Sequence, residues 1–166
     1  AKFKEENQNV KIIAGPVADP TATRKLFEVG VEVVRVGFDS RFDSQDYMET
    51  GIAMPHASCI SINSEIARNA GKHIFSSGHY TDTADISKSI CLGATGVEIS
   101  EMFYGHEESF GRTETIDGKM FKNDTQYNGQ IINTAIDMQR QLSKSCKFAG
   151  YKTLKSFRDS ASIIII

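Results

Sequence analysis

The sequence predicts an α/β fold built around a parallel sheet. Short apolar runs rich in β-branched residues alternate with helical patterns that end at glycines. The clearest example runs from Gly71 to Gly111 and reads as strand, glycine turn, amphipathic helix, second strand and glycine-containing loop. Continuous apolar strands are typical of a parallel sheet covered on both faces. There are about four such βα units, and a closed (β/α)8 barrel takes roughly 250 residues. The 166 residues of this chain therefore supply half of a TIM-type (β/α)8 barrel.

The first unit lies near the N-terminus. The apolar run Val10–Ala14 predicts a strand, which a Gly-Pro turn closes. Asp19 or Thr21 can cap the following helix, because a side-chain oxygen there accepts hydrogen bonds from the first helical turn. Apolar residues recur on one face of this helix as far as Val29. The β-branched run Val31–Phe38 then predicts the second strand.

A long polar segment separates this strand from the next helix. Residues 39–55 carry both signs of charge and show no clear period. A loop of this length in a compact domain is usually functional or mobile. Ser61 or Asn63 is expected to cap a helix that ends at Asn69. After a glycine, His73–Ser76 predicts the third strand.

The fourth unit completes the predicted sheet. Asp82 or Thr83 can cap a helix over Ala84–Leu92, and Gly96–Ser100 predicts the fourth strand. Asp117-Gly118, flanked by apolar residues in a polar segment, predicts a β-hairpin.

Two helices are predicted to follow the hairpin, one over Ile131–Leu142 or slightly longer and one over Tyr151–Phe157. We divide the chain into a flexible N-terminal segment, residues 1–9, and one domain, residues 10–166. This domain consists of the four βα units with the hairpin inserted as a flap.

Composition excludes several classes of function. The net charge of −2 gives no basic field, so no nucleic-acid partner is expected. No apolar run is long enough to cross a membrane, and no membrane partner is expected. The three cysteines are odd in number and widely spaced, which favours a reducing, cytoplasmic location over a disulfide framework. Cys91 and Cys146 fall within helical patterns as buried thiols, whereas Cys59 falls in a segment leading into a helix.

Four stretches of the sequence resemble a known family. They are KIIAGPV, HIFSSGHYTDTADISKSICLGATGVEIS, MFYGHEESFG followed by IDGKMFK, and SCKFAGYKTLKSF. In order and spacing they are similar to motifs of GMP reductase and IMP dehydrogenase, such as IMAGNVVT, HIISDGG and MLAGHSESGG. The resemblance runs from about Val10 to Ile166 and implies the C-terminal half of the family's barrel.

The resemblance also assigns the long polar segment to the family's catalytic loop. The loop keeps its length between Gly37 and Gly51, which the resemblance implies are substrate-binding positions. Ser44 stands where the family has its catalytic cysteine, and Asp46 stands where it has a threonine. A serine hydroxyl without an adjacent base is a much poorer nucleophile. Both catalytic positions are therefore expected to be inactive.

The phosphate and ribose positions differ from the family in the same way. Ser77-Gly78-His79 replaces Asp-Gly-Gly, and Ser100-Glu101 replaces Gly-Gly. A carboxylate within about 4 Å of a phosphate is repelled by roughly 1 kcal/mol even in water. These positions are interpreted as a vestigial substrate site. Glu108 matches a family glutamate near the nicotinamide and is the candidate cofactor contact.

The histidines offer a further possibility. His56, His79 and His106 could converge near the strand ends as zinc ligands. Their spacing matches no known zinc motif, so no metal is expected.

These observations lead to a main interpretation and an alternative. The main one is a catalytically degenerate relative of GMP reductase and IMP dehydrogenase that acts as a structural or interaction subunit without a cofactor. Because an open sheet has unpaired edges, it should assemble as a homo-oligomer, with a complementary half-barrel or in a larger assembly. A regulatory subunit docked on an active homologue is a variant of this reading. The alternative is the C-terminal half of an active enzyme that uses a purine nucleotide with NADPH or NAD.

Overall fold

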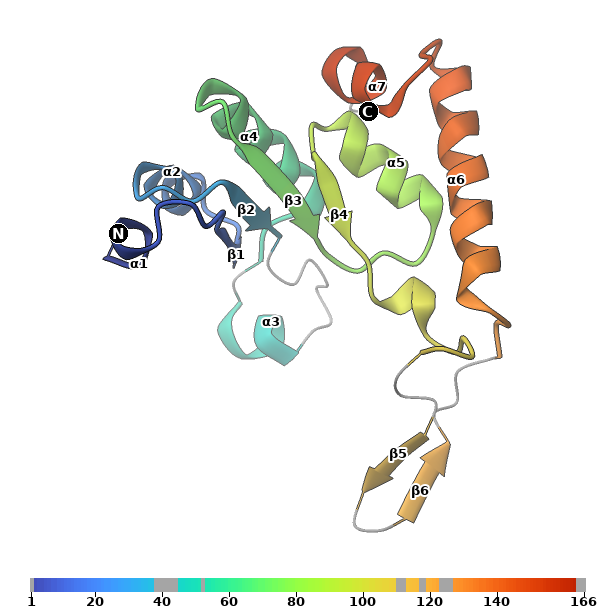
Figure 1. Cartoon of the computed structure of the whole chain (residues 1–166). Helices are drawn as coiled ribbons and strands as arrows, with labels where there is room; N and C mark the ends of the chain where they lie inside the picture. The colour runs from blue at the N-terminus through green and yellow to red at the C-terminus, as the bar shows by residue number, and fades with distance from the viewer. Residues whose placement is uncertain are drawn as a thin grey trace.

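The computed structural model describes residues 2–37, 45–51, 53–109, 113–116, 119–122 and 127–163. Four parallel strands alternate with helices and form one sheet in the order β1-β2-β3-β4 (Figure 1). These strands are Ile13–Val17, Val33–Val36, His73–Ser77 and Gly96–Glu98. The helices are α1 Lys2–Glu6, α2 Pro20–Glu28, α3 Gln45–Thr50, α4 His56–Asn69, α5 Thr83–Cys91, α6 Ile131–Phe148 and α7 Leu154–Ser160. The predicted α/β fold is confirmed, and the arrangement is consistent with a partial (β/α) barrel.

The remaining elements lie between β4 and α6. A short 3-10 helix, η1, spans Glu101–Phe103. Strands β5, Thr113–Ile116, and β6, Lys119–Lys122, pair antiparallel. The predicted hairpin is thus confirmed by its two strands, while Asp117 and Gly118 lie outside the described residues.

The core lies between the sheet and the helices α2 and α4. Val34, Val36 and Ile74 are almost fully buried on the strands, and Phe27 and Ile60 meet them from the two helices. Burial of side chains of this size supplies about 1.5–3 kcal/mol each. The strongest packing therefore holds the first three βα units together.

The opposite face of the sheet is more open. Residues that alternate with the core positions project there, and Ile13 of β1 is 54% exposed. Arg35 and Glu98 on the same face retain 33% and 47% of their side-chain exposure. Strands paired in chain order through right-handed crossovers place all their connecting helices on one face. The expectation of a sheet covered on both faces is therefore wrong for the described part of the chain.

Two predicted boundaries also need correction. Strand β1 begins at Ile13 rather than Val10, and it includes the Gly-Pro pair expected to close it. An edge strand accepts proline because one side of its backbone needs no partner. Helix α4 begins at His56, well before the predicted cap at Ser61 or Asn63.

Asn63 resembles a cap in the sequence but is a fully buried residue inside α4. Its amide nitrogen donates to the carbonyls of Ala18 and Cys59, at 3.0 and 2.8 Å. Cys59 is likewise buried within α4, not in a segment that precedes a helix. The predicted start of this helix is thus too late, because Asn63 makes a tertiary contact and does not cap the helix.

The other helices agree with the predictions to varying degrees. Asp19 and Asp82 cap α2 and α5 as expected, each accepting from backbone N–H groups of the first turn. Helix α6 continues six residues past Leu142, to Phe148. Helix α7 lies three residues later than predicted because a capping box joins Thr153 and Ser156.

Two further helices were not expected. Helix α3 lies in the polar segment predicted as loop, and α1 lies in the N-terminal segment predicted as flexible. Among the described residues, no helix has the length and apolar character needed to cross a membrane.

Candidate functional site at the carboxyl ends of the strands

The candidate substrate positions lie at the carboxyl ends of neighbouring strands. Gly37 follows β2, Ser77 ends β3 and Gly78 follows it, and Ser100-Glu101 lies just beyond β4. The register pairs Val36 with Ser76 and Ser77 with Glu98. These strands are parallel, so the positions meet at one edge of the sheet, where α/β proteins bind ligands.

The two glycines at this edge lie against the protein's own side chains. Gly37 has φ +115°, and a Cβ on it would lie closer than 3.0 Å to both the Ser77 carbonyl oxygen and His56 Cε1. A Cβ on Gly78 would lie 2.5 Å from His56 Cε1. The imidazole of His56, at the start of α4, therefore occupies the space beside both glycines.

His56 belongs to a polar network behind the strand ends. Its Nε2 lies 2.8 Å from Ser76 Oγ and 3.2 Å from the Tyr80 hydroxyl. Tyr80 donates to Ser76 Oγ at 2.5 Å and lies 2.7 Å from Ser89 Oγ. Tyr80 is only 2% exposed, so these hydrogen bonds satisfy groups that water does not reach. The network joins β3, α4 and α5.

Burial sets the ionisation of both aromatic members of the network. It lowers the pKa of His56, and the nearby Asp85 carboxylate only partly opposes this effect. It also raises the pKa of the Tyr80 hydroxyl. The Nδ1 atom of His56 is buried without a hydrogen-bond partner among the described residues. His56 is therefore held neutral in the folded protein.

An ion pair crosses the open face of the sheet just below this edge. The Arg35 guanidinium on β2 lies 2.6 Å from Glu98 on β4, and its Nη2 donates to Ser77 Oγ at 3.3 Å. Hydrogen bonds from Ser77 and Arg35 hold the pKa of Glu98 below its usual value, against a smaller opposing effect of burial. Ser77, a predicted ribose position, thus binds neighbouring side chains.

A second pair lies above the first, beyond the strand ends. His79 Nδ1 contacts the Glu101 carboxylate, which is the first residue of η1. Both residues come from the positions where the resemblance implies glycines. Ser100 precedes η1 but makes no side-chain capping bond to it.

Glu108 has a structural contact on the neighbouring helix. Its carboxylate accepts a hydrogen bond from the backbone N–H of Ile131, the first residue of α6, at 3.0 Å. The residue before it, Gln130, makes no side-chain capping bond. Glu108 therefore caps α6 from a distant part of the chain, and the negative charge suits a helix N-terminus.

The catalytic-loop positions are described only in part. Ser44 lies outside the described residues, and Asp46 is described only as backbone within α3. Gly51 follows α3 with φ +66°, and no described residue beyond its chain neighbours lies within 4 Å of where its Cβ would be. The assignment of Ser44 and Asp46 to catalytic positions therefore stays a prediction.

The histidines do not form a common site in the described part of the chain. His56 contacts Ser76 and Tyr80, His79 contacts Glu101, and His106 lies 2.6 Å from the Thr134 hydroxyl. No group of three metal-ligating residues occurs among the described residues.

Sequence reasoning missed Arg35 at this edge, and it considered His56 only as a possible zinc ligand. Arg35 is a charged residue in the apolar run VEVVRVGF, and this break in the pattern could have indicated a functional or paired position. His56 gave no comparable signal, because its role depends on an early start of α4.

The arrangement is poorly suited to holding a nucleotide with these residues. A phosphate would meet two carboxylates, Glu98 and Glu101, while Arg35 and His79 are already bound to them. Glu108, the candidate nicotinamide contact, is already bound to a backbone N–H. The described side chains of this edge thus bind one another.

The fold and this edge define the class of protein: an α/β domain with four parallel βα units and polar residues at the strand ends. Residues 1–130 match the family model described as the IMP dehydrogenase / GMP reductase domain. The chain belongs to this IMP dehydrogenase / GMP reductase family.

Individual relatives agree with this membership. A GMP reductase of Staphylococcus saprophyticus is 29% identical over 98% of the chain, and one of Bacillus subtilis is 30% identical over 93%. An inosine-5'-monophosphate dehydrogenase of Staphylococcus haemolyticus is 35% identical over 73% of the chain. The chain covers 56%, 53% and 25% of these relatives, so it spans about half the length of the GMP reductases it matches.

Proposed function

We propose that this chain is a catalytically degenerate member of the family that acts as a structural or interaction subunit. The observation that carries the proposal is the position of the His56 imidazole, which fills the space beside Gly37 and Gly78. In the family resemblance this edge receives the nucleotide. Here the close approach that the glycines permit is used by the protein itself.

The charges at this edge support the same proposal. Glu101 stands at a family glycine position and is held by His79, while Glu98 is held by Arg35. Binding a phosphate would require breaking these contacts and burying like charges together. We infer that neither a purine nucleotide nor NADPH or NAD is a natural ligand of this edge.

The exposed parts of the fold support an interaction role. Strands β1 and β4 are the two ends of the four-stranded sheet, and Ile13 on the open face is 54% exposed. Helix α6 packs on α5 and α7, and its Ile132 and Ile136 are each 54% exposed (Figure 1). In a closed barrel, a further strand and helix would cover surfaces of this kind. We propose a complementary half-barrel as the partner, which makes this chain the C-terminal half.

Calorimetry with the 166-residue chain tests the loss of nucleotide binding. We expect no saturable heat with GMP, IMP or NADPH, and the GMP reductase of Bacillus subtilis serves as the positive control. Saturable binding of GMP or IMP to the wild-type chain would show that a nucleotide site survives and would overturn the proposal. Binding that appears only in a Glu101→Lys variant would support it, because that change replaces the repelling carboxylate with a positive charge.

Light scattering after size exclusion tests the partner. We expect the chain alone to self-associate, and to form a one-to-one complex when a family N-terminal half is co-expressed. A stable monomer with no affinity for such a half would contradict the interaction role. A larger homo-oligomer that excludes the added half would favour a second copy as the partner.

The names of the relatives favour one alternative, the C-terminal half of an active GMP reductase or IMP dehydrogenase. It predicts nucleotide-dependent oxidation of NADPH or reduction of NAD once the other half is supplied. Under this alternative, a Ser44→Ala change should abolish turnover. Turnover that survives the change would exclude Ser44 as the nucleophile while retaining the enzyme.

A further inference from the structure

A cationic cavity lies at the opposite, amino-terminal end of the sheet. Its volume is about 250 Å³, and it lies between the end of α4, the starts of β3 and β4, and α7. It shares no lining residue with the strand-end site described above. Its size suits a small ligand group rather than a whole nucleotide.

Arginine, lysine and histidine side chains reach this cavity from separate elements. Arg68 comes from the last turn of α4, Arg158 from α7, and Lys72 and His73 from the start of β3. Arg68 forms no ion pair with any residue that the structure describes, and its guanidinium lies over Gly93. Among these residues, the guanidinium is a donor group without a carboxylate partner.

Two carboxylates are held by basic side chains here: Asp159, which lines the cavity, and Glu32, which pairs with the lining residue Lys72. Asp159 lies 2.6 Å from Lys155 Nζ and 2.8 Å from Arg158 Nε, and these hydrogen bonds lower its pKa to about 2. Glu32 lies 2.6 Å from Lys72 Nζ. Lys155 and Arg158 together carry two positive charges against the single negative charge of Asp159, whereas Lys72 balances Glu32. Among the described residues, one positive charge of the group around Asp159 and the charge of Arg68 therefore remain uncompensated.

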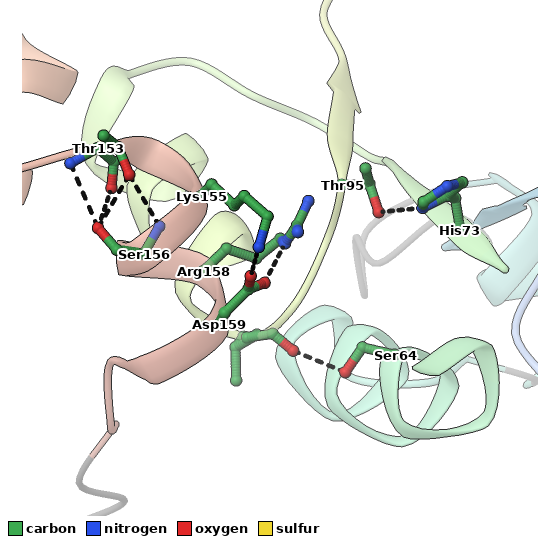
Figure 2. Close-up of polar contacts among 9 residues, drawn as sticks. Ser64, His73, Thr95, Thr153, Lys155, Ser156, Arg158 and Asp159 are labelled. Atoms are coloured by element: carbon green, nitrogen blue, oxygen red, sulfur yellow. Dashed lines mark hydrogen bonds and ion pairs between the residues drawn. The ribbon is translucent and has the colours of Figure 1, made fainter. Parts of the chain in front are cut away.

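Figure 2 shows Lys155, Arg158 and Asp159 on α7, together with Thr95 and His73. Arg158 extends from α7 past Asp159 toward the segment that carries Thr95, so its outer nitrogens point away from the carboxylate. The Thr95 hydroxyl lies 3.4 Å from His73 Nδ1 on the adjacent strand. A hydroxyl and an imidazole therefore lie across the cavity from the guanidinium of Arg158.

We propose that this cavity binds a phosphate dianion, either free or as the phosphate of a small phosphomonoester. Arg68 and Arg158 supply the planar donor groups that suit phosphate oxygens, and Thr95 and His73 supply further polar contacts. The site is independent of nucleotide binding at the other end of the sheet. A result that overturns the function proposed above would therefore leave the phosphate proposal unaffected, and the reverse also holds.

The test uses inorganic phosphate titrated into the 166-residue chain at low ionic strength, followed by calorimetry and by backbone amide shifts. We expect saturable binding with shifts at residues 68–74 and 93–95. Changing both arginines, Arg68→Gln with Arg158→Gln, should weaken binding by about tenfold or more, since two charge-assisted contacts are lost. Arg68→Gln alone should give a smaller loss and involves no ion pair within the described fold.

Two further variants separate the site from its surroundings. Lys155→Gln removes a cation that binds Asp159 but does not line the cavity, so the loss of phosphate affinity should be smaller than that of the double arginine variant. Arg140→Gln removes an exposed arginine on α6 and should leave affinity unchanged. Equal losses in Arg140→Gln and Arg68→Gln would show nonspecific charge attraction and overturn the proposal.

A second titration identifies the form of the ligand. Ribose 5-phosphate that binds more tightly than phosphate, with the same shifts, would assign the site to phosphomonoesters. Tighter binding of phosphate itself would assign it to the free anion. No saturable binding of either probe, or shifts centred on Gly78 and Glu101, would overturn the site.

Discussion

The two ends of the sheet differ in how their charged residues are used. At the carboxyl end, Arg35 binds Glu98, His79 binds Glu101, and His56 fills the space beside two glycines. At the amino end, Arg68 remains unpaired among the described residues and faces a cavity of about 250 Å³. The end where the fold usually binds ligands is thus closed by the protein's own side chains, while the other end keeps uncompensated positive charge. The two proposals made above therefore depend on which side chains lie at each end and not on the position in the fold alone.

The largest effect should come from filling the space beside the strand ends. Gly37→Ala places a Cβ closer than 3.0 Å to the Ser77 carbonyl and the His56 ring, at φ +115°. Backbone strain and overpacking should together lower the free energy of unfolding by about 3 kcal/mol or more. Urea denaturation measures this change.

Gly51→Ala is the matched control for this prediction. Gly51 also has positive φ, +66°, but no described residue beyond its chain neighbours lies within 4 Å of its added Cβ. Gly51→Ala should therefore lower the free energy of unfolding by about 1 kcal/mol, from backbone strain alone. Equal costs for the two variants would mean that His56 does not pack against the strand ends.

A smaller effect is expected from removing one hydroxyl of the buried network. Tyr80→Phe leaves Ser76 and Ser89 without the group that bridges them at 2.5 and 2.7 Å. Ser76 keeps His56 as a partner, whereas the Ser89 hydroxyl loses Tyr80, and the change should lower the free energy of unfolding by about 2 kcal/mol. Tyr104→Phe, at a half-exposed tyrosine, should change it by less than about 0.5 kcal/mol. If both variants kept wild-type stability, the network would not hold α4 and α5 to β3.

The same network should make stability depend on pH. Burial lowers the pKa of His56 in the folded state, so the unfolded state binds the proton more readily. The contribution of neutral His56 to the free energy of unfolding is present above the ordinary histidine pKa near 6.5. This contribution is lost as the pH falls below that value toward the pKa of His56 in the folded protein. The slope should reach at most about 1.4 kcal/mol per pH unit.

Denaturation of wild type and His56→Gln between pH 7.5 and 5 measures this dependence. The variant should show a flatter profile over that range, whatever its absolute stability. A slope unchanged by His56→Gln would contradict the burial of a neutral imidazole.

Sequence patterns located much of the fold because local signals agreed with it. The caps at Asp19 and Asp82 are formed as predicted, and the β-branched runs placed β2 and β3. The start of α4 could not be predicted, because Asn63 has the chemistry of a cap yet donates to Ala18 and Cys59 in the core. Local sequence preference cannot distinguish an asparagine that caps a helix from one that donates a tertiary hydrogen bond.

The candidate site was predictable only in outline. Parallel strand order alone places Gly37, Ser77 and Glu101 at one edge, as expected from the sequence. The partners of these residues could not be inferred, because His56 reaches the edge from a helix whose start was missed. The cationic cavity was equally hidden, since Arg68 and Arg158 are 90 positions apart in the chain and only tertiary packing brings them together.

The smallest effect should come from the ion pair on the open face, and it sharpens the contrast between the two ends. Arg35 and Glu98 retain 33% and 47% of their side-chain exposure, so solvent screens their attraction. Glu98→Gln should lower the free energy of unfolding by less than about 1 kcal/mol at neutral pH. Because contacts with Ser77 and Arg35 lower the pKa of Glu98, this contribution should be lost as pH falls through the folded-state pKa. Wild type and variant should then converge at acidic pH in urea denaturation. A constant difference at every pH would assign the effect to packing and leave the charges at this end without a stabilising role.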